Sequence, residues 1–513
     1  MGVGNGEDIP VADDGPGIAL NEDNSHFLWT RVGRDVSAAD VDGWVDQYAG
    51  TQVRELMLCA NAMRTSYDSA VWDSIWTGYD PAGGDDQPLF ASLAANERAD
   101  AHACVRLAWS LDQKGIDVYA RWIARCRAVG ISPWISSRMN DIHSVDDEAN
   151  YLHSAFWRAH PEYRRVPDRD RAEVWADRAL DFGHAAVRDH HMALLREMCE
   201  RYDFDGLELD WMRFGLHFRP GGEAAGREVL TAYTAEVRRL LDDHAKRRGH
   251  GIKLGARVPA RPDTAWTLGM DAAAWAKEGL IDMLVVTPHF PTIDTDMPIE
   301  LWKQLLDGTG VTLAAGLELM VWPWVDYPNP QTNSLETARG AAASVIERGA
   351  DRVYLFNYMD SQTAMSDLAN YPTLLREVGS LATLAGKHRR HIVTRADTWA
   401  PGDAPSCALP AKLGAGGDVA FRVHVGPRPA GRVMVVLGLI DGEGVSDVGL
   451  AVRNNGVVCG AGRGVDVDDP RPEFATFGFE VAGESVQGGY NIIEVHAERG
   501  CEIGWVEMDV GRG

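Results

Sequence analysis

The sequence lacks the cysteine spacing, the long apolar runs and the basic charge that mark several common protein classes. Its seven cysteines are scattered and never form a Cys-x-x-Cys pair, so neither a zinc centre of that type nor a disulfide framework is expected. No apolar run approaches the length of a membrane span. Residues 1–25 are polar and rich in Gly and Asp, without the apolar core of a signal peptide. We therefore expect a cytoplasmic protein, or a secreted one if a leader has been trimmed.

Basic residues are outnumbered by acidic ones. The chain has 50 Lys and Arg against 75 Asp and Glu, which gives a formal net charge of −25 at pH 7. Proteins that bind nucleic acids or anionic membranes carry basic faces, so neither is an expected partner. A solvated acidic surface, which favours solubility, accounts for most of the excess. Neither a Gly-x-Gly-x-x-Gly loop nor a Walker-type loop follows the first apolar run, and no cofactor is predicted.

The sequence is long and rich in tryptophan. A chain of 513 residues exceeds one ordinary core and indicates two or three domains. Its composition, 45% hydrophobic and 24% charged, is that of a globular protein. The 17 tryptophans are a surplus, and such a surplus often supplies aromatic binding platforms in addition to core.

Short apolar runs alternate with helix-compatible sequence over residues 26–386. The eight strand candidates cover residues 26–31, 53–59, 131–137, 204–211, 252–258, 281–287, 311–319 and 351–359. Alternating strands and helices imply a parallel sheet, and eight repeats fit an α/β fold of the (β/α)8 TIM-barrel type with long insertions. A doubly wound open sheet is the alternative, but it usually has fewer strands and a phosphate-binding glycine loop after the first.

The pattern changes after residue 386. Residues 387–409 are interpreted as a linker, and residues 410–513 contain short strand patterns separated by Gly, Asn and Pro turns. No helix of any length is indicated there, so a C-terminal β-sandwich of roughly 100 residues is predicted. This domain is expected to be either a rigid cap on the barrel or a carbohydrate-binding module.

The segment "YDFDGLELDWMRF", residues 202–214, concentrates acidic groups in what is otherwise a buried strand. By the two-residue period of a strand, its leucines face one side while Glu208 and Asp210 face the other. Buried ionised carboxylates are costly unless they are paired or lie at the rim of a cleft. Two interpretations follow: active-site carboxylates, or ion pairs with arginines such as Arg257 or Arg213.

In a barrel of this kind, chemistry takes place at the C-terminal ends of the strands. All eight strand candidates present polar or aromatic residues on that side, which a purely structural barrel does not require. The residues expected to bind substrate are Trp29, Arg64, Arg138, Asn140, Asp141, His143, Trp211, Arg213, Arg257, His289, Trp322, Asn357 and Tyr358. Surface positions for Arg64 and Arg138, and ordinary loop positions for His143 and His289, are the alternatives.

Glu318 is the acidic residue of the seventh strand candidate, and it is followed by tryptophans. The fourth and seventh strands stand nearly across a barrel from each other, so Asp210 and Glu318 are the predicted catalytic pair. Glu208 is the reserve acid, because burial beside a like charge raises the pKa of a carboxyl group. Such a pair suits a glycosidic bond, where one carboxyl protonates the leaving oxygen and the other attacks or activates water. No metal site is predicted.

The fourth-strand segment also carries a family resemblance. "RYDFDGLELDWMRF" resembles the motif Y-x-V-D-G-I-x-x-D-x-x-R of the family-10-like group of glycosyl hydrolases. The preceding "LDFGHAAVRDHHMALLREMCERY" resembles the helix that leads into that motif. The resemblance covers residues 26–385 and not the β-domain. It implies a glycoside-hydrolase-like TIM barrel, carbohydrate hydrolysis, and importance for Asp210 and Arg213.

Two weaker likenesses concern the same segment. The chitinase signature D-G-x-D-x-D-W-E is nearly matched, but Met212 stands at its catalytic glutamate and cannot transfer a proton. This departure at Met212 therefore excludes a chitinase mechanism of that type. The amylase-type motif D-G-x-R-x-D aligns Asp210 with a nucleophile, while Glu208 stands where that family has arginine.

The sequence thus predicts an enzyme, a glycoside hydrolase that acts on an oligo- or polysaccharide. A non-catalytic carbohydrate-binding barrel is one alternative. A metal-dependent lyase or isomerase acting on a sugar, with Glu208, Asp210, His289 and Glu318 as ligands, is another. The sequence leaves open the sugar, the linkage, endo or exo action, retention or inversion, and the oligomeric state.

Overall fold

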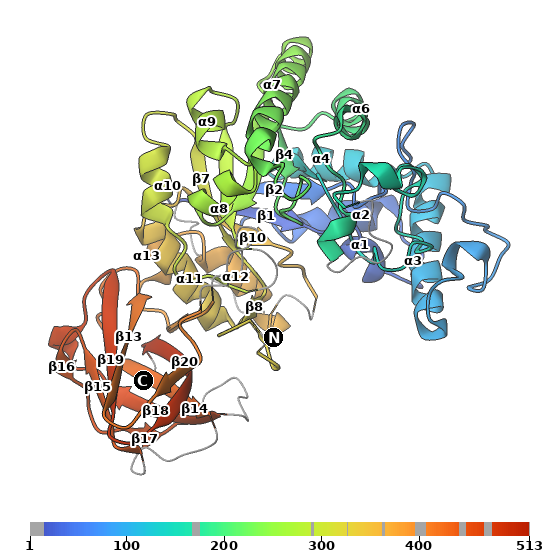
Figure 1. Ribbon diagram of the computed structural model, residues 1–513. Coiled ribbons are helices and arrows are strands. Elements are labelled where there is room, and N and C mark those ends of the chain that lie inside the picture. The colour runs from blue at the N-terminus through green and yellow to red at the C-terminus, as the bar shows by residue number, and fades with distance from the viewer. Residues whose placement is uncertain are drawn as a thin grey trace, which may run out of the picture.

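The computed structural model describes residues 15–166, 175–288, 292–325, 327–361, 365–395, 407–440, 448–465 and 474–511. Within these ranges the chain forms a helix-surrounded barrel followed by a smaller all-β domain (Figure 1). The predicted fold class, a TIM barrel with a C-terminal β-sandwich, is confirmed.

The barrel is a closed sheet of eight parallel strands in the order β1-β10-β7-β6-β5-β4-β3-β2. Its strands are β1 (Ile18–Glu22), β2 (Val53–Cys59), β3 (Ser132–Arg138), β4 (Gly206–Asp210), β5 (Lys253–Pro259), β6 (Met283–Thr287), β7 (Thr312–Leu317) and β10 (Arg352–Phe356). Helices cover the outer face, so the strands are apolar on that side. The inner face is filled by side chains that include Trp134, Met283 and Tyr354, which makes the barrel a packed core and no pore.

The prediction of the first strand is wrong. Residues 26–29 form the short helix α1 (His26–Trp29), and the first strand lies earlier, at Ile18–Glu22. The barrel therefore begins inside the segment that was interpreted as a polar N-terminal stretch. The reason is that a short apolar run does not distinguish a strand from a buried helix. Phe27 and Leu28 are buried although they belong to a helix, so their apolar character did not reveal which element they form.

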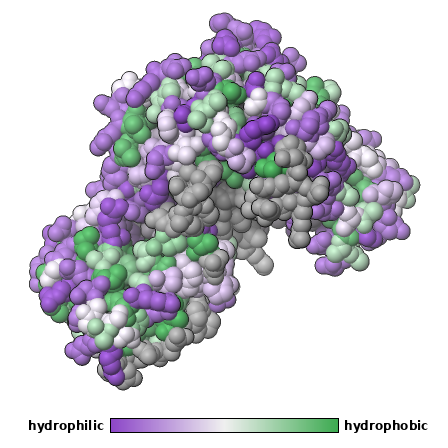
Figure 2. Space-filling model, viewed as in Figure 1, coloured by the Kyte–Doolittle hydropathy of each residue, from purple (hydrophilic) through white to green (hydrophobic). Residues whose placement is uncertain are grey.

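The outer helices are α2 (Ala38–Asp46), α3 (Ala95–Gln113), α4 (Val118–Ala128), α5 (Ala155–Ala159), α6 (Ala185–Arg201), α7 (Glu223–Arg248), α8 (Pro262–Thr267), α9 (Ala272–Lys277), α10 (Ile299–Leu305), α11 (Leu335–Glu347), α12 (Tyr371–Glu377) and α13 (Leu381–Leu384). Ser37 caps α2: its Oγ accepts from the amide of Asp40, whose carboxylate accepts from the amide of Ser37. Hydrophilic residues dominate the surface over α7 (Figure 2). No helix in the described ranges is long and apolar enough to cross a membrane.

The C-terminal domain consists of two antiparallel sheets. One contains β11 (Arg389–Ile392), β12 (Ala411–Leu413), β14 (Val433–Ile440), β17 (Arg463–Gly464), β18 (Phe474–Glu480) and β20 (Cys501–Val510). The other contains β13 (Gly417–His424), β15 (Leu450–Asn454), β16 (Val457–Val458) and β19 (Tyr490–Ala497). β11 lies within the predicted linker. Its charged sequence resembled a loop, but Arg390 is buried in an ion pair with Glu507 at 2.8 Å.

The two domains pack directly against each other. α11 contacts β11 so closely that a Cβ at Gly340 would lie 2.0 Å from the carbonyl oxygen of Arg390. Tyr327, in the segment between β8 (Met320–Val321) and β9 (Gln331–Thr332), stacks on Phe474 with ring centroids 6.0 Å apart. Figure 1 shows the β-domain beside α11 and β8. The β-domain is therefore attached to the barrel by a packed aromatic interface.

The aromatic side chains of the β-domain do not form a sugar-binding platform on the part of its surface that the structure describes. Trp505, Phe421, Phe474 and Phe479 are buried, while Phe477 and Tyr490 are half-buried. Stacking on sugar rings requires exposed aromatic faces. The packed interface with the barrel is consistent with the expectation of a rigid cap.

Candidate active site

Strands β4, β5 and β7 direct charged side chains toward the barrel axis near their C-terminal ends. Glu208 and Asp210 of β4 point inward while Leu207 and Leu209 join the outer core, as the two-residue period predicts. Asp210 pairs in register with Arg257 of β5. Glu318 follows the last residue of β7 and is wholly buried. The predicted catalytic carboxylates therefore lie at the same end of the barrel.

Arg257 lies between the two carboxylates of the predicted catalytic pair. Its Nη1 donates to both carboxylate oxygens of Asp210, at 3.1 and 3.3 Å, and its Nη2 donates to Oε1 of Glu318 at 2.9 Å. The guanidinium also lies 3.6 Å from the ring centroid of Phe356, and the Arg257 side chain is only 1% exposed. The expected ion pair of Asp210 with Arg257 is thus present, and it includes Glu318. Arg257, predicted to bind substrate, holds the carboxylates instead.

Three donors converge on Asp210. Besides Arg257, the amides of Met212 and Arg213 donate to its Oδ1 at 3.0 and 2.9 Å. Charge-assisted hydrogen bonds of this kind stabilise the ionised form of a carboxyl group. Asp210 is therefore built to carry negative charge although it is buried.

Glu318 has a different environment. Burial raises the pKa of its carboxyl group to about 7, although Arg257 and Arg213 oppose the increase. Oε1 accepts from Arg257 and from Thr287 at 3.3 Å, while Oε2 has no hydrogen-bond partner among the described residues. Its main-chain oxygen accepts from the hydroxyl of Tyr358 at 2.8 Å. Glu318 is therefore a carboxyl group that can hold a proton near neutral pH in a fixed position.

Glu208 lies one layer deeper in the barrel. Its Oε1 accepts from Ser136 at 2.7 Å, from the hydroxyl of Tyr354 at 2.9 Å and from Asn21 at 3.3 Å. Burial, followed by the nearby charge of Asp210, raises its pKa to about 7. The predicted reserve acid is thus a second proton-holding carboxyl group beneath Asp210.

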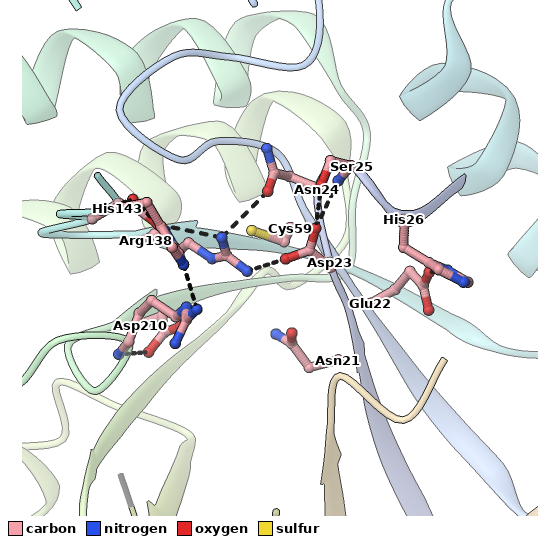
Figure 3. A network of polar contacts seen from close by, with 12 residues as sticks. Asn21, Glu22, Asp23, Asn24, Ser25, His26, Cys59, Arg138, His143 and Asp210 are labelled. Carbon is pink, nitrogen blue, oxygen red and sulfur yellow. Dashed lines mark hydrogen bonds and ion pairs between the residues drawn. The ribbon is translucent and has the colours of Figure 1, made fainter. Parts of the chain in front are cut away.

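A second polar network lies on the β1 and β3 side of the barrel end (Figure 3). Arg138, at the end of β3, forms ion pairs with Asp23 and with Asp141, the latter at 3.3 Å, and donates to Asn24 at 3.3 Å. Burial opposes the ionisation of both acids, but Arg138 holds the pKa of Asp23 well below its usual range, and His143 with Arg138 does the same for Asp141. Arg138 is therefore a buried charge with two carboxylate partners. The alternative of a surface position for this residue is wrong.

His143 connects this network to Arg213. Its Nδ1 lies 2.8 Å from Oδ1 of Asp141, and its Nε2 lies 2.6 Å from Nη2 of Arg213. Because a guanidinium can only donate, Nε2 accepts and the ring proton is on Nδ1. The predicted residues Arg138, Asp141, His143 and Arg213 thus form one connected group beside Asp210.

Other predicted residues are not part of this group. Arg64 donates to the main-chain oxygens of His153 and Thr77, and Asn140 donates to that of Leu180, so both side chains support loops. Trp211 is buried in the outer core, where its ring packs edge-on against other aromatic rings. Its prediction as a binding residue overlooked that it alternates with Asp210 and must face the other way.

The remaining predicted residues have varied positions. Trp29 lies on α1 with 41% of its surface exposed. Trp322 is half-buried beneath the guanidinium of Arg395, next to the β-domain. Asn357 follows β10 in the left-handed backbone region, with φ of 54°. His289 lies outside the described residues.

Sequence reasoning missed several residues of the barrel interior. Asn21 and Asp23 were overlooked because the strand "IALNE" was assigned to the N-terminal stretch. Ser136 and Tyr354 lie inside strands, where the alternation with buried apolar neighbours was the available signal.

In the described part of the chain, no three His, Cys, Asp or Glu side chains are grouped to hold a metal ion. The space between Asp210 and Glu318 is occupied by a guanidinium.

No protein-family model matches the sequence, and no curated protein matches it. Solved structures with a similar course of the chain include alpha-L-fucosidase isoenzyme 2 from Paenibacillus thiaminolyticus, at 13% identity and TM-score 0.42, over 70% of this chain and 48% of that one. The PgaB (BpsB) glycoside hydrolase domain from Bordetella bronchiseptica matches at 12% identity and TM-score 0.40, over 71% and 99%. The GH20 beta-N-acetylhexosaminidase from Streptomyces coelicolor A3(2) matches at 11% identity and TM-score 0.36, over 75% and 64%.

The match thus spans about half the length of the fucosidase. These likenesses concern the fold, and the TIM barrel expected from the fourth-strand motif is established by the closed sheet itself. A barrel of this architecture supports many activities, so the function depends on the side chains at its C-terminal end.

Proposed function

We propose that this protein is a glycoside hydrolase in which Asp210 and Glu318 are the catalytic carboxyl groups. The observation that carries the proposal is the contrast between these two acids at one barrel end. Asp210 accepts four hydrogen bonds from three donors that favour its ionised form, whereas burial raises the pKa of Glu318 to about 7. Hydrolysis of a glycosidic bond requires this division between an ionised and a protonated carboxyl group.

The contrast supports the following roles. Glu318 is the general acid: it holds a proton near neutral pH, and its Oε2 is not engaged by any described residue. Asp210 is the nucleophile or the base that activates water, since its charge is stabilised before substrate arrives. Arg257 fixes the distance between the two, because its guanidinium contacts both.

Glu208 is a supporting residue in this proposal. It stands two residues before Asp210 on the same strand, roughly 7 Å along it, and points the same way. Two such groups do not flank a bond. A protonated Glu208 instead keeps a second negative charge away from Asp210, and its contacts with Ser136 and Tyr354 fix its position.

A carbohydrate substrate suits the neighbouring side chains. His143 is partly exposed, and Arg213 and Asn357 lie at the same barrel end. Amide, imidazole and guanidinium groups are the usual partners of sugar hydroxyls. The substrate class is therefore a polyhydroxylated sugar chain or glycoside.

The decisive experiment compares wild type, Asp210→Asn and Glu318→Gln on a panel of aryl glycosides and oligosaccharides. Release of sugar by the wild type and its loss in both variants, with the fold intact by circular dichroism, supports the proposal. Unchanged hydrolysis in both variants contradicts the assignment of these residues.

A non-catalytic carbohydrate-binding barrel is the second candidate. The observation that favours it is the burial of both carboxylates, 1% exposure or less, with one arginine between them. A buried charge cluster of this kind also occurs as a purely structural element. Binding of glycans on an array without release of any product would support this candidate over hydrolysis.

A further inference from the structure

The end of β1 carries another polar cluster, separate from the Arg138 network, that the proposed reaction does not use. Glu22 faces away from the barrel axis, because it alternates with Asn21 and Asp23. Its Oε1 contacts Nδ1 of His26, one helical turn later in α1. Figure 3 shows Glu22 and His26 together on the opposite side of β1 from Asp23.

His26 contacts a third residue from a distant part of the sequence. Its Nε2 lies 3.3 Å from Oδ1 of Asp360, in the segment that follows β10. The side chains of His26 and Glu22 are 4% and 1% exposed, and that of Asp360 is 25% exposed. The imidazole presents an N–H to both carboxyl groups only when it is protonated, and Nε2 then faces Asp360 as an ion pair without hydrogen-bond geometry.

The segments that His26 joins leave neighbouring strands of the barrel. Asn21 of β1 pairs with Phe356 of β10, and the amide of Asn357 donates to the oxygen of Asn21 at 3.1 Å. Asp23 follows Glu22 directly and contacts Arg138. The cluster therefore lies immediately behind two segments that contribute to the candidate active site.

We propose that Glu22, His26 and Asp360 form a proton-dependent clamp, in which protonated His26 holds the segments after β1 and β10 together and so positions Asp23 and Asn357. The three are positioning residues, because they lie behind the two segments and do not point toward the barrel axis. The clamp does not depend on the chemistry proposed above, because its contacts join two segments whatever the barrel binds.

The surroundings of the clamp determine the direction of its pH dependence. The other ionisable groups whose charges act on the clamp residues are Asp23, Arg31, Tyr48 and Tyr371. Burial raises the pKa of Glu22 from 4.5 to about 7, with His26 opposing. Burial also disfavours the charge on His26, but Glu22 and Asp360 raise its pKa above 6.5.

Both shifts are upward, so the folded clamp holds protons more tightly than the unfolded chain. A raised pKa gives stability that is complete below the unfolded value and lost as the pH rises through the folded one. For Glu22 this loss falls between pH 4.5 and about 7, and for His26 it begins at pH 6.5. The clamp is therefore closed in acid, where protonated Glu22 still accepts from His26 through its carbonyl oxygen, and it loosens as the solution becomes alkaline.

Hydrogen exchange measured by mass spectrometry tests the clamp without reference to activity. Protection of the segments 22–31 and 356–361, corrected for the exchange rate of an unstructured chain, is compared between about pH 5 and about pH 9. In the wild type, protection of both segments should fall several-fold across this range. In Glu22→Gln, whose amide does not titrate, the fall should be smaller. In His26→Leu, protection of both segments should be low at every pH.

A matched control is available at the other end of the barrel. His250 pairs with Asp203 at 2.7 Å in an exposed position, so Asp203→Asn removes a histidine partner without touching the clamp. This variant should show the wild-type pH dependence in both segments. If His26→Leu does not fold, Asp360→Asn replaces it, since Asp360 is the most exposed member.

The proposal is overturned if the segment 356–361 keeps wild-type protection in His26→Leu or Asp360→Asn. It is also overturned if Glu22→Gln retains the full pH dependence. Either result can be obtained whether or not the protein hydrolyses a sugar, so failure of the clamp and failure of the proposed function are distinguishable.

Discussion

Arg257 and Glu318 meet at 2.9 Å inside the barrel, and both side chains are almost wholly buried. The guanidinium of Arg257 comes from β5 and the carboxylate of Glu318 from the end of β7, so the contact joins two strands that β6 separates. The same guanidinium contacts Asp210. One buried cation therefore contacts both proposed catalytic groups, and the first predictions concern this arrangement.

The two acids should respond differently to the leaving group of the substrate. Asp210→Asn and Glu318→Gln are each expected to lower kcat/KM on unactivated oligosaccharides, by about 100- to 10,000-fold for loss of a general acid. A dinitrophenyl leaving group needs no protonation, so Glu318→Gln should recover much of its activity on dinitrophenyl glycosides while Asp210→Asn should not.

Steady-state kinetics of both variants on paired substrates measure this difference. Glu162→Gln, an exposed glutamate that pairs only with His160 among its described contacts, is the control and should match the wild type. Equal losses on both classes of substrate in Glu318→Gln would show that Glu318 is not the acid.

Removal of the central cation should destabilise the protein in a pH-dependent manner. Arg257→Met leaves two buried carboxylates without their partner, which is expected to lower the free energy of unfolding by about 3–5 kcal/mol. The loss should be smaller at acidic pH, because protonated carboxyl groups need no cation. Urea denaturation at two pH values measures both effects.

The control for this change is an exposed ion pair of the same chemistry. Arg125 pairs with Asp46 at 2.5 Å on the surface, so Arg125→Met should cost about 1 kcal/mol or less. A cost for Arg257→Met in the same small range would contradict the structural role of the buried arginine.

Activity should decline as the pH rises through about 7. A general acid must be protonated, and burial places the pKa of Glu318 near that value. In Glu318→Gln the residual activity on dinitrophenyl glycosides should lose this alkaline limb, because the acid that titrates has been removed. The pH profiles of kcat/KM for the two proteins provide the comparison, and an unchanged limb in the variant would assign it to another group.

The packing of α11 against β11 predicts an effect far from the site. In Gly340→Ala the new Cβ would lie 2.0 Å from the carbonyl oxygen of Arg390, so the helix and the strand must separate. Overpacking of this kind costs typically about 1–3 kcal/mol. Gly43 of α2 has no atom within 4 Å of such a Cβ, and Gly43→Ala should be neutral or stabilising. Thermal unfolding of both variants compares them, and equal melting temperatures would contradict the contact.

The sequence was most informative where a pattern repeats. Alternation of strands and helices predicted the barrel, and the change to short strands with turns predicted the β-domain. The two-residue period also placed Glu208 and Asp210 on the inner face of β4. It failed at the first strand, because "IALNE" is short and the following "HFLW" is equally apolar, so local sequence does not separate a strand from a buried helix.

Residue types alone did not distinguish binding groups from structural ones. Arg64, Asn140 and Trp211 have the chemistry of sugar-binding residues, but their side chains contact main-chain oxygens or the outer core. Trp211 illustrates the cause: it follows Asp210 directly, and neighbours in an extended chain face opposite sides. The strand period was sufficient to exclude it, whereas the partners of Arg64 and Asn140 depend on loops that fold from distant parts of the chain.

The sequence by itself determined the fold class and the presence of inward-facing acids, because both follow from local periodicity. Only the tertiary structure decided that Arg257 lies between Asp210 and Glu318 and that His26 lies between Glu22 and Asp360. The contacts of Arg257 join different strands of a closed barrel, and His26 of α1 joins the end of β1 to the segment after β10. Their burial is what raises the pKa of Glu22 and Glu318, and burial is a property of the folded molecule that no local pattern contains.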